Sequence, residues 1–215
     1  MKRIAILVVS VLVASVTPSI AASAKPAASV LVLGDSVFNA FNHVDTATAL
    51  LKRQQPTIIA TEGCQRLLKE GCLGMAKISA LQQLRRNAGK FTDVVVVGTG
   101  YNDRLGPDFK KAVFDIVEEA SAQGVDVLWV TYREAGNVRG KSRVLNEQLR
   151  RFDARFANLH VADWNAHSEG SEGWFRDDNV HLITRGAVEL ARLLNASLKP
   201  IFEARAAAAA AVPAS

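Results

Sequence analysis

The chain has 215 residues, of which 49% are hydrophobic, and carries a formal net charge of +5 at pH 7. This length suits one domain with a substantial core. The excess of positive charge is small and forms no basic stripe, so the sequence predicts no nucleic-acid partner.

Residues 1–24 have the pattern of an export signal. Lys2 and Arg3 precede an apolar stretch over residues 4–16, and Ala-Ser-Ala at residues 22–24 offers a small-residue cleavage site. The apolar stretch is short for a bilayer span, and no later segment is long enough to be one. We therefore expect a secreted, periplasmic or cell-envelope protein with no stable membrane insertion after cleavage; an uncleaved anchor is the alternative.

Apolar runs rich in β-branched residues recur after the signal, bounded by turn residues. They cover residues 30–33, 57–61, 94–97, 125–130 and 159–161. Nearly continuous apolar runs of this length are typical of parallel strands that are buried on both faces. Helical patterns lie between and after them, at residues 109–120, 145–156 and 187–194.

This alternation of strands and helices predicts a three-layer α/β/α sandwich with right-handed crossovers. The expected sheet is flavodoxin-like, with five parallel strands in the order 2-1-3-4-5. We expect the domain to span residues 25–205. The alanine-rich residues 206–215, which include one proline, are expected to form a disordered tail.

Three short strings carry the chemistry. They are GDS at residues 34–36, GYND at residues 100–103 and DNVH at residues 178–181. A serine hydroxyl is a poor nucleophile until a base takes its proton, and an imidazole base needs a carboxylate to fix its tautomer. Ser36, His181 and Asp178 supply these groups, and one tight turn can place the Asp178 carboxylate against the His181 ring.

In this order the strings resemble the blocks of the SGNH (GDSL-type) hydrolases, from about Val30 to the last helix. The resemblance implies a serine esterase without a cofactor, in which Ser36 is the nucleophile, His181 the base and Asp178 the orienting carboxylate. Val37 and Asn179 depart from the family pattern, which commonly has leucine and glycine there, but neither position supplies reacting atoms. The α/β-hydrolases share the chain order Ser, Asp, His, yet the sequence has no Gly-x-Ser-x-Gly string.

The resemblance also implies an oxyanion hole made by the Ser36 N–H, the Gly63 N–H and the Asn102 side-chain amide. Ser36, Gly63 and Asn102 follow the first, second and third predicted strands. These strands are neighbours in the expected order, and ligands of such sheets bind at the carboxyl edge. Each residue also has a plain interpretation: Ser36 as a cap or turn residue, Gly63 as a turn glycine, and Asn102 as a loop cap.

The chain has four histidines, and more than one of them could act as the base. His167 follows Asp163 by four residues and is the alternative base–carboxylate pair. His181 is preferred because it completes the last block of the family, just before a helix that Thr184 can cap. No set of metal ligands occurs at sensible spacing, so we expect no metal site.

Cys64 and Cys72 are the only cysteines. An even count in an exported chain predicts a disulfide, with two buried thiols as the alternative. A bridge would hold the backbone directly after Gly63, where an oxyanion donor must not move.

Short connections leave little room for a lid, so the sequence favours an open site for short-chain acyl esters of a small molecule, glycan or lipid. We expect a monomer. One alternative is an O-acyltransferase that acts on envelope glycans through the same acyl-enzyme. The other is a catalytically silent binding protein on the same fold.

Overall fold

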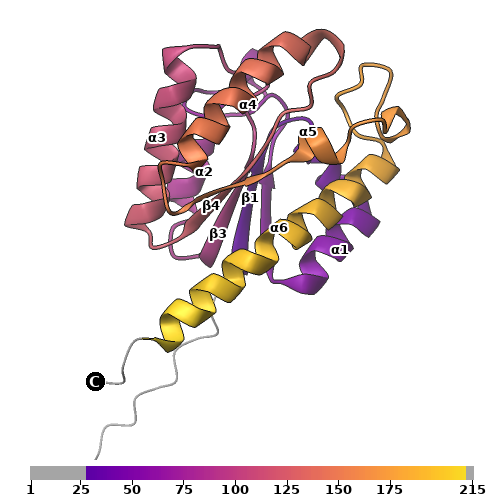
Figure 1. Cartoon of the computed structure of the whole chain (residues 1–215). Coiled ribbons are helices and arrows are strands. Elements are labelled where there is room, and N and C mark those ends of the chain that lie inside the picture. The colour runs from indigo at the N-terminus through magenta and orange to yellow at the C-terminus, as the bar shows by residue number, and fades with distance from the viewer. Residues whose placement is uncertain (1–27, 212–215) are drawn as a thin grey trace, which may run out of the picture.

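A computed structural model describes residues 28–211 and shows a sheet between two helical layers (Figure 1). The strands are β1 (Ala28–Gly34), β2 (Thr57–Thr61), β3 (Phe91–Gly98), β4 (Asp126–Val130) and β5 (Leu159–Ala162). They pair in parallel in the order β2-β1-β3-β4-β5. The predicted fold class and strand order are therefore confirmed.

Helices cover both faces of the sheet, as Figure 1 shows. One layer contains α1 (Asp45–Gln54) and α6 (Thr184–Ala210). The other contains α2 (Ala80–Arg86), α3 (Pro107–Ala122) and α4 (Arg139–Asp153). Short turns of helix lie in the loops: η1 (Phe38–Asn42), η2 (Cys72–Gly74), η3 (Gly136–Val138), α5 (Trp164–His167) and η4 (Glu172–Trp174).

Strand β3 shows why the strands have apolar residues at nearly every position of the sequence. Val94 and Val96 pack into the core beneath α1 and α6, whereas Val95 and Val97 pack into the core beneath α2, α3 and α4. All four side chains are fully buried. Because successive side chains of a strand point to opposite faces, a strand covered on both sides needs apolar residues at every position.

Helix α6 extends further than the sequence pattern indicates. It continues to Ala210, so the prediction of a disordered tail is wrong for residues 206–210. Alanine has the highest helix propensity of all residues, which explains the extension. Residues 212–215 and the predicted signal over residues 1–24 lie outside the described part of the chain. The predicted Thr184 cap is also wrong, since the helix has no side-chain cap at its start.

Far from that start, Arg205 anchors α6 to the amino edge of the sheet. Its guanidinium donates to the Asp126 carboxylate at 2.7 Å and to the Gly124 carbonyl at 2.9 Å. No helix of residues 28–211 has the length and apolar character of a membrane span.

Candidate active site

The loops at the carboxyl edge of the sheet bring Ser36, His181 and Asp178 together. His181 Nε2 lies 2.9 Å from Ser36 Oγ, and His181 Nδ1 lies 2.5 Å from Asp178 Oδ2. Ser36 follows β1, and the other two residues directly precede α6. The imidazole therefore has a carboxylate on one nitrogen and a hydroxyl on the other, which is the arrangement that activates a serine.

The turn over residues 178–181 holds the carboxylate in place. Asp178 Oδ1 accepts the N–H groups of Val180 and His181, both at 2.9 Å. Burial raises the pKa of Asp178, but hydrogen bonds from the His181 ring and these two N–H groups outweigh it and leave the pKa below its usual value. Asn179 has a φ of 58°, a left-handed conformation that asparagine tolerates. A left-handed φ is also a conformation that glycine adopts readily, so asparagine can stand where the SGNH blocks that the sequence resembles commonly have glycine.

Asp35 organises the turn that presents Ser36. Its side chain is fully buried, and Oδ1 accepts the Val37 N–H at 3.1 Å. Burial raises the pKa of Asp35 to about 7, although N–H groups of Val37, Gly100 and Tyr101 act to lower it. The carboxyl group therefore lies between the serine turn and the loop that carries Asn102.

The loops that follow β2 and β3 are tied to each other beside Ser36. Asn102 Nδ2 donates to the Gln65 carbonyl at 3.3 Å, and the Asp103 carboxylate accepts the Leu67 N–H at 3.1 Å. A carboxamide has two N–H donors, so Asn102 keeps a second one for a ligand. Asp103 thus acts as a brace between the loops.

Gly63 lies at the start of the loop after β2, with its backbone N–H available. Neither this N–H nor the Ser36 N–H donates a hydrogen bond within residues 28–211. A Cβ on Gly63 would meet the Met75 methyl at 3.0 Å, so Met75 covers this glycine. Cys64 and Cys72 form a disulfide with Cα atoms 5.6 Å apart, as predicted, and it closes the loop directly after Gly63.

The comparisons with known proteins identify the fold. No protein-family model and no curated protein matches the sequence. The C-terminal catalytic domain of peptidoglycan O-acetyltransferase A from Streptococcus pneumoniae matches with a TM-score of 0.62 and 18% identity, over 83% of this chain and 97% of that one. A candidate SGNH hydrolase from Slackia heliotrinireducens matches with a TM-score of 0.61 and 21% identity, over 80% and 99%. The chain has the SGNH hydrolase fold.

A third similar structure is the psychrotrophic esterase EstA from a Pseudoalteromonas species, in a form inhibited by monoethylphosphonate. It matches with a TM-score of 0.62 and 18% identity, over 81% of this chain and 98% of that one. Both the O-acetyltransferase and the esterase thus share the SGNH fold with this chain, and their sequences are distant from it.

The alternative base–carboxylate pair does not form. Asp163 Oδ1 instead accepts the Thr131 hydroxyl at 2.9 Å and caps α5 by accepting the Ala166 N–H at 3.1 Å. The nearest charged partner of His167 is Glu189, with Nε2 3.9 Å from the carboxylate. Because Asp163 holds a loop, it is unavailable to orient an imidazole.

Arg133 holds a loop beside the candidate site, and the sequence did not reveal it. It follows β4 and is only 5% exposed, although arginine is rarely buried. Its Nε donates to the Asn179 carbonyl at 3.0 Å, and its Nη1 donates to the Ser168 carbonyl and hydroxyl. The guanidinium carbon also lies 3.8 Å from the centre of the Phe175 ring.

The backbone of Arg133 adds a second link, because its N–H donates to the Tyr101 hydroxyl at 2.7 Å. Arg133 therefore ties the loop that carries Asp178 and His181 to β4 and to the Asn102 loop. The only cue in the sequence is its position just after a buried strand.

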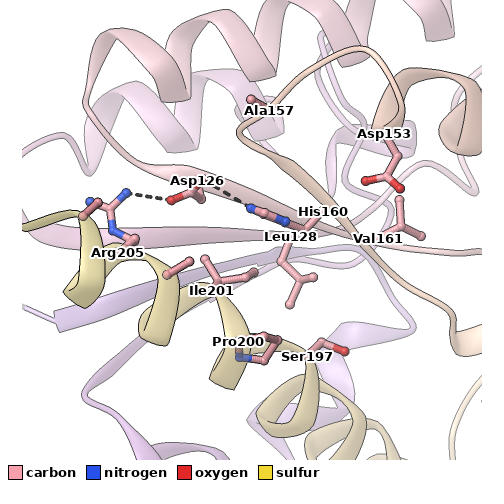
Figure 2. A pocket seen from close by; sticks show the side chains of 12 residues that line it. Asp126, Leu128, Asp153, Ala157, His160, Val161, Ser197, Pro200, Ile201 and Arg205 are labelled. Carbon is pink, nitrogen blue, oxygen red and sulfur yellow. Dashed lines mark hydrogen bonds and ion pairs between the residues drawn. The ribbon is translucent and has the colours of Figure 1, made fainter. Parts of the chain in front are cut away.

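Two cavities differ in what they can do. One, of about 300 Å³, is lined by both Ser36 and His181. A larger one, of about 660 Å³, lies between β4, β5 and α6 at the amino edge of the sheet (Figure 2). Inside it, Asp126 pairs with His160 and Arg205. Only the smaller cavity adjoins a nucleophile with a base.

The residues that the structure describes contain no group of three or more His, Cys, Asp or Glu side chains placed to hold a metal ion.

Proposed function

We propose that this protein is an exported serine esterase that hydrolyses short-chain acyl esters without a cofactor. The contact between His181 Nε2 and Ser36 Oγ, at 2.9 Å, is the observation that carries the proposal. The cavity of about 300 Å³ at this contact has room for a short acyl group. Export is inferred from the pattern of residues 1–24.

In the proposed reaction, Ser36 Oγ bonds to the ester carbonyl carbon while its proton passes to His181 Nε2. The carbonyl oxygen takes the negative charge and receives hydrogen bonds from the N–H groups of Ser36 and Gly63 and from the Asn102 amide. The bond to the alcohol then breaks, and His181 returns the proton to the departing oxygen. Water repeats these steps on the acyl-enzyme and releases the acid.

Transfer of the acyl group to a glycan hydroxyl is the second candidate. It is favoured by the match to the catalytic domain of a peptidoglycan O-acetyltransferase. The same acyl-enzyme would form, and a sugar hydroxyl would replace water in the second half of the reaction. Such an enzyme would also belong in the cell envelope.

The test is a series of nitrophenyl esters of increasing chain length, each assayed with and without a glycan acceptor. The proposal predicts rapid turnover of acetyl and butyryl esters, with release of the free acid even when acceptor is present. Acylated glycan as the main product would favour the transferase. His181→Ala should abolish turnover, whereas His167→Ala is the matched control. Equal losses in both variants would contradict the assignment of the base.

A further inference from the structure

Another cavity adjoins Asn102. It has a volume of about 390 Å³ and lies between the loop after β2 and the start of α3. Its wall includes four cationic side chains: Arg66, Lys69, Arg104 and Lys111. Asn102 belongs both to this wall and to the proposed oxyanion hole, so the cavity adjoins one side chain of the proposed reacting centre.

The carboxylates of this wall do not balance its positive charge. Asp108 pairs with Lys69 at 3.4 Å, and both side chains are exposed, which makes the pair weak. The Asp103 carboxylate accepts a hydrogen bond from the Leu67 N–H. Burial raises the pKa of Asp103 to about 6, although the positive charges of Lys141, Arg66 and Lys69 act to lower it. Lys111 pairs outside the cavity, with Asp115.

Arg66 and Arg104 have no ion pair within residues 28–211. Arg66 Nε is in addition buried and without a hydrogen-bond partner in that part of the chain. A buried donor without an acceptor costs free energy, and a guanidinium fork matches a carboxylate or phosphate. An anion in this cavity would give the Arg66 and Arg104 guanidinium groups the ion-pair partner that they lack within residues 28–211.

We propose that this cavity binds an anionic group, a carboxylate or a phosphate, that the ester substrate itself carries. The inference rests on the proposed esterase function and narrows its substrates to negatively charged esters. The anion would dock beside Asn102 and hold the ester carbonyl near Ser36. Its binding would be weakened by salt, because the cationic side chains are partly in solvent.

The test compares esters that differ only in charge. Mono-nitrophenyl succinate is paired with nitrophenyl butyrate, and acetylated glucose 6-phosphate with acetylated glucose, so that carboxylate and phosphate are tested separately. The protein is the full chain after export. We expect kcat/KM to be about tenfold or more higher for at least one anionic ester at low salt, as hydrogen bonds to charged groups predict. Which pair shows the preference identifies the anion.

The Arg66→Gln/Arg104→Gln variant should lose this preference, bringing the anionic-to-neutral ratio of kcat/KM close to one. Arg104→Gln alone should lower the anionic-to-neutral ratio of kcat/KM in part. Because Arg104 is exposed, this single variant should fold and keeps the test informative if the double variant misfolds. Lys52→Gln/Arg53→Gln removes the same charge from the end of α1 and should keep the wild-type ratio.

Hydrolysis of neutral esters with no preference for either anionic partner would overturn this inference and leave the esterase intact. So would a preference that survives in the Arg66→Gln/Arg104→Gln variant. Failure to hydrolyse any ester, together with an unreactive Ser36, would instead overturn the esterase function.

Discussion

Replacing Arg133 with lysine should slow ester hydrolysis while the protein stays folded. The guanidinium holds the loop over residues 168–179 through the Ser168 and Asn179 carbonyls, and this loop leads directly to Asp178 and His181. Lysine keeps the positive charge but has no planar fork, so it cannot donate to both carbonyls in the same geometry.

The size of the effect follows from the bonds that are lost. Arg133 donates to the Asn179 carbonyl, the Ser168 carbonyl and the Ser168 hydroxyl. Each hydrogen bond from a charged donor contributes about 1.5–3 kcal/mol, and lysine can recover one of the three. A net loss of about 3 kcal/mol corresponds to a decrease of roughly a hundredfold in the preference for the ordered loop.

The assay combines kinetics with hydrogen exchange. The kcat/KM of Arg133→Lys for nitrophenyl acetate should be about a hundredfold below that of wild type. If the loop closes on the substrate, the decrease should appear mainly in kcat. Amide exchange over residues 168–181 should quicken, while exchange in β1 and β3 stays slow. Guanidinium ion added to Arg133→Ala should restore part of the activity, an effect that a general loss of stability would not produce.

Arg143→Lys is the matched control, because Arg143 is an exposed arginine on α4 whose nearest carboxylate, on Glu134, lies 3.6 Å away. It should keep wild-type kinetics and exchange. Wild-type turnover in Arg133→Lys, or slow turnover with unchanged exchange over residues 168–181, would refute the role given to Arg133.

Three further predictions concern the loops around Ser36. Asn102→Ala should reduce kcat by about 10²–10³ with little change in KM, since one oxyanion donor is worth about 2.7–4 kcal/mol; an effect on KM alone would make Asn102 a ground-state binding residue. Burial raises the pKa of Asp35 to about 7. The free energy of unfolding of wild type, measured with urea, should therefore fall relative to that of Asp35→Asn as the pH rises from about 4 to 7. An equal pH dependence of the two free energies would contradict this. Reduction of the Cys64–Cys72 disulfide should lower kcat before the far-ultraviolet circular dichroism changes, and simultaneous loss would show a global role.

The fold was predictable because buried parallel strands leave a strong pattern. Runs such as residues 94–97 are apolar at every position, and their spacing leaves room for crossover helices. The apolar pattern of α1 and α2 is weaker, and the sequence did not predict these helices. The only local signal for α2 is its capping box, in which the Ser79 hydroxyl accepts the Gln82 N–H at 3.2 Å.

The convergence of Ser36, Asp178 and His181 at the candidate site was predictable from three strings, since the loops at one edge of a parallel sheet lie close together. The parts that escaped prediction depend on contacts between segments far apart in the chain. Nothing in the sequence around Arg133 shows that its guanidinium will donate hydrogen bonds to the carbonyl oxygens of Ser168 and Asn179. Similarly, Gly34 and Gly98 are glycines because Phe38 packs against both, a contact made only in the folded chain.

The central claim is that His181 activates Ser36, and covalent labelling tests it most directly. A fluorophosphonate should add one equivalent to the protein, and peptide mass spectrometry should locate it on Ser36. Labelling should become far slower in His181→Ala and be absent in Ser36→Ala. A label on another residue, or an equal rate of labelling in His181→Ala, would contradict the account.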